Sequence, residues 1–341
     1  MNTQAGGHPI TAPADSSDEA VLACLLDSDP ALHWQVERAL VGAPAEVWEA
    51  TRARVTEEGF GARLLALQDP DGQWSGGAYF PARGSAGAPD PGDTEQPWTA
   101  TTWSLGALRS WGCPAEALGA TPDRLERNAR WEYDDLPYWD GEVDVCINAF
   151  TLANGLWLGR DMDALAQWFV DHAMDEGGWN CEWVEGSTRA SVDSTINALE
   201  GLLEYERGTG GTASTRAART AGEDYLLERR VLHRLTDDSP IVPRQTVFAY
   251  PPRAAYSALR VLDHFRAANE VASSGSLRGD DHLTEAVELV RSRRKPDGTW
   301  HQDWRHGGKM WFEADVPPGH PSPWLTFRAL RVLRWWDNST G

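Results

Sequence analysis

The sequence predicts an all-α fold in which paired inner and outer helices close into a ring, an (α/α)6 toroid. Three observations support this prediction. A segment made of an amphipathic helix and a Gly-Trp turn recurs along the chain, a more apolar helix follows each copy, and no span alternates like a β-strand. A helix with one apolar face suits the outside of a ring, whereas a helix apolar on most sides is surrounded by protein. Recurrence of this kind indicates a repeat-built fold.

The outer helices come first in each repeat. The amphipathic segment is clearest at residues 59–74 and 287–300, where the helix leads into the turns QDPDGQW and KPDGTW. Weaker copies occupy residues 126–142 and 165–182. Each copy carries charge along one face, as a helix exposed on one side should.

The more apolar helices are expected at residues 98–112, 145–159, 191–205, 254–265 and 324–336. With the outer helices they make five pairs, in the regions 59–111, 123–158, 161–206, 215–267 and 282–336, and residues 18–57 supply the sixth. We expect residues 1–16 to be a disordered tail. Residues 17–341 are expected to form a single toroid domain, because no linker between domains is apparent.

The loop lengths predict which end of the ring is functional. Connections from an outer to an inner helix are long and rich in Gly and Pro, as at residues 75–97, 239–252 and 301–321, whereas the return connections are short. Because every pair turns over in the same sense, the long loops must share one rim. Long ordered loops are usually functional, so we expect the site at this rim.

The composition excludes several classes of protein. The 341 residues carry 31 Lys and Arg against 51 Asp and Glu, a formal net charge of −20. Such a surface repels nucleic-acid phosphates and anionic lipid. No apolar run is long enough to cross a bilayer, and the N-terminus lacks the pattern of a secretory signal. We therefore expect a cytoplasmic protein with no nucleic-acid partner and no transmembrane segment; its oligomeric state is left open.

One motif resembles a known family. The turn at residues 68–74, QDPDGQW, resembles the Q-x-x-x-G-x-W motif of squalene-type triterpene cyclases, in which the Gln and Trp brace the outer helices. Residues 295–300, KPDGTW, repeat it without the Gln. The resemblance extends from about residue 30 to the end of the chain and implies the α-toroid superfamily of terpenoid cyclases and protein prenyltransferases. These motifs are structural, so they imply a fold rather than a reaction.

Two shorter matches concern chemistry. Residues 191–196, SVDSTI, resemble the D-x-D-D-T-A segment of class II terpene cyclases, with Asp193 at the position of the proton donor and serines in place of the flanking acids. Residues 143–147, VDVCI, are similar to the V-D-G-C-Y segment of protein prenyltransferase β-subunits, in which Asp and Cys ligate zinc. This second match implies Asp144 and Cys146 as ligands, and the family's third ligand, a His, has no counterpart here.

The placement of four groups predicts a zinc site. Asp144 and Cys146 lie at the start of one inner helix, Asp193 at the start of the next, and Cys181 in the rim loop between them. Neighbouring pairs in a ring bring these groups to one side of the rim. Two thiolates with one or two carboxylates are a reasonable ligand set for zinc. A helix N-terminus also lowers the pKa of a thiol.

Structural roles compete with these assignments. Asp is a favoured N-cap, worth about 1 kcal/mol, which would account for Asp144 and Asp193 alone. A single Cys is often a small buried hydrophobe, and this inert role is expected for Cys24 and Cys113. Three rim-loop histidines are candidates for a further ligand or a base, with a solvated side chain as the default: His301, His306 and His320.

Tryptophan is abundant, with 18 residues. Five of them fall in or beside the predicted rim and inner helices: Trp98, Trp103, Trp179, Trp183 and Trp324. They could form an aromatic bowl that stabilises carbocations by cation–π contacts of about 0.5–2 kcal/mol each. Plain core packing explains any one of them equally well.

The sequence therefore predicts an enzyme that acts on a small hydrophobic, isoprenoid-like substrate in the mouth of the toroid. In the leading mechanism, zinc held by Cys146 and Cys181 with Asp144 or Asp193 is a Lewis acid, and the other carboxylate moves protons. In the alternative, a protonated Asp193 starts a metal-free reaction like that of a class II terpene cyclase. The third alternative is a non-enzymatic protein on the same fold that binds a hydrophobic ligand or is a scaffold.

Overall fold

The computed structural model describes residues 16–271 and 279–338, and 54% of the protein is helical. These residues contain no β-strand, only isolated bridges. The α-helices are α1 (Ser16–Leu26), α2 (Pro30–Val36), α3 (Ala45–Ala53), α4 (Gly59–Leu65), α5 (Thr101–Ser110), α6 (Thr121–Asn128), α7 (Val145–Trp157), α8 (Asp163–Asp171), α9 (Val192–Thr209), α10 (Ala213–Glu228), α11 (Ala258–Val271), α12 (Asp281–Ser292) and α13 (Pro323–Asp337). The short helical turns are η1 (Glu37–Val41), η2 (Arg54–Thr56), η3 (Ala115–Leu118), η4 (Tyr138–Asp140) and η5 (Cys181–Glu185).

The all-α class predicted from the repeats is confirmed, and the helical fraction is well above the usual third. The five segments predicted as apolar helices contain or overlap α5, α7, α9, α11 and α13. The weak outer copy at residues 126–142 is mostly loop, because α6 ends at Asn128. The expected tail, residues 1–16, lies outside the described residues except for Ser16, where α1 begins.

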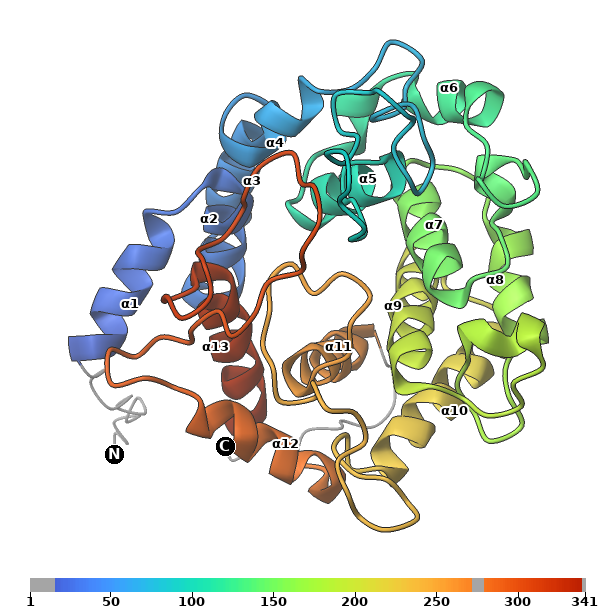
Figure 1. Ribbon diagram of the computed structural model, residues 1–341. Helices are drawn as coiled ribbons and strands as arrows, with labels where there is room; N and C mark the ends of the chain where they lie inside the picture. Colours follow the sequence, from blue (N-terminus) through green and yellow to red (C-terminus); the bar gives the residue numbers. More distant parts are fainter. Residues whose placement is uncertain (1–15, 272–278, 339–341) are drawn as a thin grey trace, which may run out of the picture.

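The helices pack against one another in chain order. α5 contacts α7, α7 contacts α9, α9 contacts α11, and α11 contacts α13. Figure 1 shows these five helices around the middle of the molecule, with α6, α8, α10 and α12 toward the outside. At the ends of the chain, α13 contacts α1 and η1, α2 contacts α4, and α4 contacts α5. The first and last helices therefore lie side by side.

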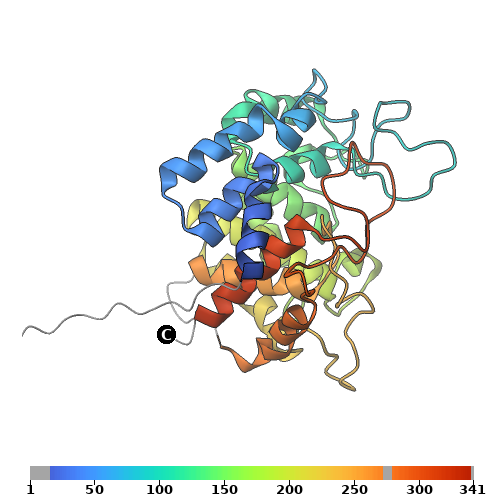
Figure 2. The same cartoon turned by 90° about the vertical axis from the view of Figure 1, so that its left-hand side faces the viewer.

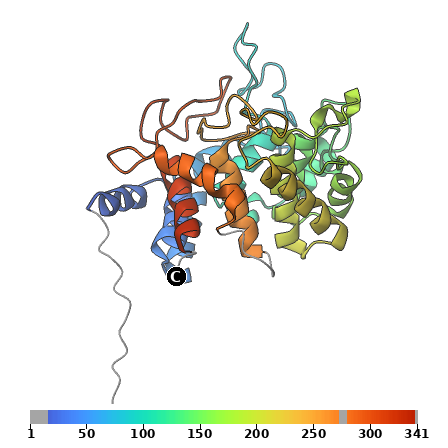
Figure 3. The same ribbon diagram turned by 90° about the horizontal axis from the view of Figure 1, so that it is seen from below.

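The long loops project from one end of the molecule. Figures 2 and 3 show residues 75–97, 239–252 and 301–321 on the same side of the helices, as the loop lengths predict. Trp98 links the first of these loops to the last. Its backbone N–H donates to the carbonyl of Lys309 at 2.8 Å, and its indole N–H donates to the carbonyl of Gly307 at 2.6 Å. No helix in the described residues is long and apolar enough to span a membrane.

The Gly-Trp turns share one set of contacts. Trp74, Trp179 and Trp300 are buried, and each indole N–H donates to the carbonyl ten residues earlier, at 2.8–2.9 Å. Each backbone N–H donates at 3.0–3.1 Å to a threonine in the first turn of the next inner helix: Thr101, Thr195 and Thr326. The repeated tryptophan therefore ties an outer helix, its turn and the following inner helix together. The glycine two residues earlier supplies the left-handed φ of each turn, from 80° to 95°.

A second contact of the motif joins successive outer helices. The Gln68 amide donates to the carbonyl of Gly72 at 3.0 Å and to the hydroxyl of Thr121, the first residue of α6, at 2.8 Å. Arg294 takes this place in the last repeat. Its Nε donates to the carbonyl of Gly298 at 3.1 Å, and its Nη2 pairs with Asp18 of α1. An arginine therefore does between α12 and α1 what the glutamine does between α4 and α6.

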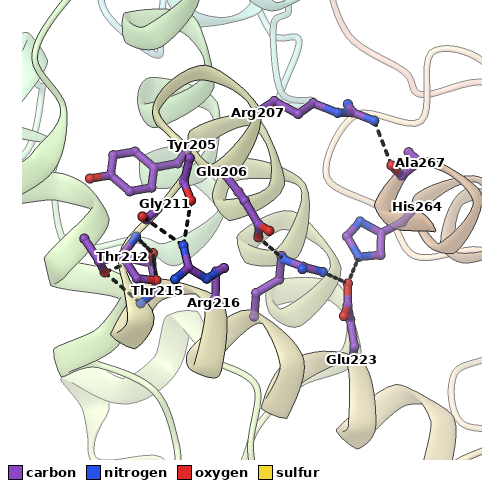
Figure 4. A network of polar contacts seen from close by, with 12 residues as sticks. Tyr205, Glu206, Arg207, Gly211, Thr212, Thr215, Arg216, Glu223, His264 and Ala267 are labelled. Atoms are coloured by element: carbon purple, nitrogen blue, oxygen red, sulfur yellow. Dashed lines mark hydrogen bonds and ion pairs between the residues drawn. The ribbon is translucent and has the colours of Figure 1, made fainter. Parts of the chain in front are cut away.

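A buried ionic network fixes α10 against its neighbours. Arg219 pairs with Glu206 of α9 at 2.9 Å and with Glu223, and the His264 ring of α11 lies 2.8 Å from the Glu223 carboxylate. Figure 4 shows Glu206, Glu223 and His264 converging from three helices. None of the four side chains is more than 10% exposed. Because buried charges persist only when paired, the network holds one outer helix against two inner ones.

Candidate active site

An aromatic cavity of about 170 Å³ lies between α5 and the rim loops. Its aromatic lining comes from four segments of the chain: Trp98, Trp103, Trp111, Phe150, Tyr250, Trp311 and Phe312. Aromatic faces carry partial negative charge, so a cavity lined in this way suits an apolar or cationic species. Two of the five tryptophans singled out from the sequence, Trp98 and Trp103, are in this lining.

Hydrogen bonds hold most of these rings in place. The Trp111 indole N–H donates to the Tyr250 hydroxyl at 3.1 Å, and the Trp311 indole N–H donates to the carbonyl of Thr99 at 3.0 Å. The Trp103 indole nitrogen is buried without a hydrogen-bond partner among the described residues. The guanidinium of Arg253 lies 4.7 Å from the Trp98 ring centre, and its burial lowers its pKa to about 10. The protein itself therefore places a cation against this aromatic wall.

A carboxyl group that sequence reasoning missed, Asp315, also lines the cavity. Its Oδ2 accepts a hydrogen bond from the Ser322 hydroxyl at 2.6 Å, whereas Oδ1 is buried and has no partner within the described part of the chain. Burial raises the pKa of Asp315 to about 6, against the lowering effects of the Ser322 and Val316 N–H hydrogen bonds. Asp315 is thus a buried, readily protonated carboxyl in the lining of the aromatic cavity.

The start of α13 positions this carboxyl. Ser322 is the N-cap of α13 and accepts from the Leu325 N–H at 3.0 Å while its hydroxyl donates to Asp315. The Trp324 indole N–H donates to the carbonyl of Ala314 at 2.9 Å, and its ring stacks on Tyr250 at 4.3 Å between ring centres. Trp324, expected to bind substrate, is outside the lining of this cavity and holds the segment that carries Asp315.

A second, more polar cavity of about 350 Å³ adjoins the first. The two share part of their lining: Arg109, Ser110, Phe150, Glu200 and Arg328. Most arginines in the second cavity are neutralised; Arg331 and Arg266, for example, both pair with Asp263.

Arg109 and Arg328 are the exceptions. Arg109 donates to the Asn154 amide oxygen at 3.0 Å, and Arg328 lies 5.3 Å from the Tyr250 ring centre. Neither forms an ion pair with any residue that the structure describes. Glu200 at the same junction pairs with Arg260, so these two arginines leave the junction with an excess of positive charge in a chain whose net charge is −20.

The structure brings the two predicted thiols together. Cys146, the second residue of α7, and Cys181, the first of η5, have their sulfurs 3.3 Å apart. The Ser194 hydroxyl donates to the Cys181 sulfur at 3.3 Å, and the Asn197 amide donates to the Cys146 sulfur at 3.4 Å. The hydrogen bond between the thiols lowers the pKa of Cys181 and raises that of Cys146, whose burial adds to the rise.

The two predicted carboxylates have different positions. The Asp193 carboxylate accepts from the backbone N–H of Tyr256, ahead of α11, at 2.8 Å. Asp144 is at the N-cap position of α7, but its side chain makes no capping hydrogen bond. The actual side-chain cap of α9 is Ser191, two residues before Asp193. Neither aspartate therefore caps its helix, and Asp193 connects α9 to the segment that precedes α11.

The described residues do not bring a complete zinc donor set together. In residues 16–271 and 279–338 no group of three or more His, Cys, Asp or Glu side chains is placed to hold a metal ion. Cys146 and Cys181 supply two ligands, and the Asp193 carboxylate is turned toward a backbone N–H. Zinc in proteins takes at least three protein ligands. No chemical step is therefore assigned to a metal here, and zinc binding stays a prediction from the sequence.

The remaining candidates lie elsewhere. Trp179 is the buried tryptophan of a Gly-Trp turn, and the Trp183 indole N–H donates to the carbonyl of Val143 at 2.8 Å; neither lines the two cavities. Burial and the nearby charge of Arg253 lower the pKa of His306 to about 4. A neutral ring packed between Trp98 and Trp304 differs from the solvated loop histidine expected by default.

No protein-family model, curated protein or solved structure matches the chain. The resemblance to terpenoid cyclases and protein prenyltransferases consequently rests on the short motifs in the sequence alone.

Proposed function

We propose that the chain is an enzyme of the α-toroid type, with six helical pairs closed into an (α/α)6 ring, that acts on a small hydrophobic, isoprenoid-like molecule. The observation that carries this proposal is the Asp315 carboxyl, with one free buried oxygen and a raised pKa, in a cavity lined by seven aromatic rings. A titratable group with a perturbed pKa in an apolar cavity is a candidate catalytic group.

The chemistry that this arrangement favours is proton transfer to a carbon–carbon double bond or an epoxide. The O–H of protonated Asp315 would transfer its proton to the substrate, leaving a carboxylate and a carbocation. The surrounding ring faces stabilise such a cation by about 0.5–2 kcal/mol each. Loss of a proton from the cation to the carboxylate would then restore the acid. In this role Asp315 replaces Asp193, whose carboxylate is engaged by the Tyr256 N–H.

The junction of the two cavities indicates an anionic or strongly polar end on the substrate. Arg109 and Arg328 line both cavities and have no carboxylate partner among the described residues. An amphiphile would place its apolar body among the aromatic rings and its anionic group at these guanidinium groups, which suit carboxylate or phosphate.

The binding-protein alternative shares the cavity but not the acid. A protein that only holds a hydrophobic ligand has no need of a carboxyl whose pKa burial raises toward neutrality. The distinguishing observation is therefore turnover, not affinity.

The test begins with ligand binding. Thermal unfolding would be followed with geranyl and farnesyl phosphates and with the matched alcohols, because a ligand that binds only the folded state raises its stability. Phosphates that bind would then be incubated with the protein, and the products analysed by gas chromatography and mass spectrometry. Substrate loss with the native protein and none with Asp315→Asn supports the proposal.

Matched variants separate the parts of the proposal. Arg328→Gln should weaken binding of the phosphate by about tenfold, or about 1.4 kcal/mol, and leave binding of the alcohol unchanged. Binding without conversion under all conditions would favour the binding protein. Conversion that survives Asp315→Asn and stops in Asp193→Asn would return the acid to Asp193.

A further inference from the structure

A pair of thiols lies outside the cavities proposed for catalysis. Cys146 and Cys181 are 35 positions apart in sequence, and both are only partly buried. They come from different segments, the first turn of α7 and the rim loop after α8. Of the other two cysteines, Cys24 is exposed and Cys113 is buried.

The sulfurs are already close to bonding distance. They are 3.3 Å apart, and a disulfide needs about 2.05 Å, so a side-chain movement of about 1.3 Å would join them. Two donors from α9 hold the sulfurs in this position: the Ser194 hydroxyl at Cys181 and the Asn197 amide at Cys146.

Two other common roles of paired cysteines, zinc binding and catalysis, do not account for this pair. A zinc site needs further ligands that the described residues do not bring to the pair. The proton chemistry proposed for Asp315 does not involve either sulfur. The close approach of two partly exposed thiols therefore calls for a separate explanation.

We propose that Cys146 and Cys181 are a redox-active pair that forms a reversible disulfide. The oxidant would be a low-molecular-weight disulfide of the glutathione class. The Cys181 thiolate attacks one sulfur of that disulfide and releases the other as a thiolate. The Cys146 thiolate then attacks the Cys181 sulfur and releases the second. The protein loses two protons and two electrons, and the small disulfide gains the two electrons as two thiols form.

The disulfide would act on the cavities through Asn197. The Asn197 amide that donates to the Cys146 sulfur belongs to a side chain that lines the polar cavity, and its oxygen accepts from Arg260 at 2.8 Å. Arg260 in turn pairs with Glu200, which lines both cavities. Moving the Cys146 sulfur toward Cys181 therefore removes one hydrogen bond from a network that reaches the proposed substrate site.

The test uses the full-length protein, reduced, desalted in the presence of a chelator and then treated with excess oxidised glutathione. We expect a peptide that links Cys146 to Cys181 and is about 2 Da lighter than the two reduced peptides together, while the exposed Cys24 takes up glutathione. Dithiothreitol should restore all four thiols. In Cys146→Ser, Cys181 should end as a mixed disulfide with glutathione because its resolving thiol is missing. Cys113→Ser is the matched control and should form the link normally.

Two results would overturn the proposal. One is native protein that keeps both thiols, or carries stable glutathione on Cys181, under conditions in which the exposed Cys24 is modified. The other is protein purified without chelator that holds one zinc per chain, lost in both Cys146→Ser and Cys181→Ser, because the thiols would then be metal ligands. Circular dichroism of each variant separates these results from misfolding.

Discussion

Two partly buried aspartates of this protein are in opposite electrostatic states. Asp263 of α11 accepts hydrogen bonds from Arg331 at 2.8 Å and Arg266 at 2.9 Å, and although burial opposes ionisation, these arginines hold its pKa well below the usual range. Asp315 has no arginine partner; burial outweighs the hydrogen bonds from the Ser322 hydroxyl and the Val316 N–H, and its pKa rises to about 6. Asp263 is consequently a fixed anion and Asp315 a titratable acid.

The comparison shows how the same residue type is given different roles by its partners. Burial by itself favours the protonated form of both carboxyls. The two differ in the number of arginines that lie close enough to stabilise the carboxylate. A carboxylate with two arginines stabilises the packing of inner helices. A carboxyl with a free oxygen can exchange a proton with a bound molecule. Each difference leads to a measurable outcome.

The largest effect is expected for Asp263→Asn. Removing the charge leaves Arg331 and Arg266 partly buried beside each other, which should lower the free energy of unfolding by about 3 kcal/mol. Urea unfolding followed by circular dichroism measures this. The control is Asp123→Asn, which breaks an exposed pair with Arg160 and should cost less than about 1 kcal/mol. Equal small losses in both variants would show that the buried pairing contributes little.

Asp315→Asn should have the reverse pattern. The amide keeps the shape and the contact with Ser322 but cannot donate the acid proton, so turnover of a substrate should fall about 100-fold, or about 2.7 kcal/mol. Thermal stability should stay constant or increase, because the variant no longer buries an ionisable group. Full activity in a folded Asp315→Asn protein would remove Asp315 from the mechanism.

The pH dependence follows from the raised pKa of Asp315. As a general acid it is active when protonated, so the rate should fall about tenfold per pH unit above about 6. Between the ordinary value of 3.8 and about 6 the folded state binds more protons than the unfolded state. The free energy of unfolding therefore declines as pH rises through that window. Asp315→Asn should remove this part of the pH dependence, and an unchanged difference between the two proteins across the window would contradict the assignment.

The smallest effect is expected at Asp193. It is the reference for Asp263 and Asp315 because its carboxylate accepts a hydrogen bond from a backbone N–H. Asp193→Ala removes the acceptor of the Tyr256 N–H and should cost about 1 kcal/mol of stability or somewhat more. Asp193→Asn keeps an acceptor and should change stability by less than about 0.5 kcal/mol. Activity should follow stability in both variants. A 100-fold loss of turnover in a stable Asp193→Asn protein would instead support the original prediction from the sequence.

Much of the fold could be predicted from the sequence because its signals are local. The Gly-Trp turns mark the ends of outer helices, since each needs a left-handed glycine and a tryptophan that reaches back ten residues. The approach of Cys146 to Cys181 also followed from placing consecutive repeats side by side. These inferences needed only the order of the elements.

The acid was missed because its environment is not local. Asp315 lies in a long rim loop that the sequence identified as functional, but nothing in GKMWFEADVPPG distinguishes it from the solvated Glu313 two residues earlier. Its pKa depends on burial and on the Ser322 hydroxyl, both created when the loop folds over the inner helices. Likewise, the sequence placed Asp193 at the rim but gave no sign that the Tyr256 N–H would engage it.

The contacts between the two ends of the chain determine when the cavity can exist during synthesis. Arg294 reaches Asp18, 276 positions away, Arg334 donates to the carbonyl of Leu40, and Trp98 reaches Gly307, 209 positions away. A ribosome makes the first helices long before α13, so those helices must wait with apolar faces uncovered. Asp315 and Arg328 emerge last. The proposed catalytic site and the completed core would therefore arrive in the same folding event, and a chain cut short before α13 would lack both.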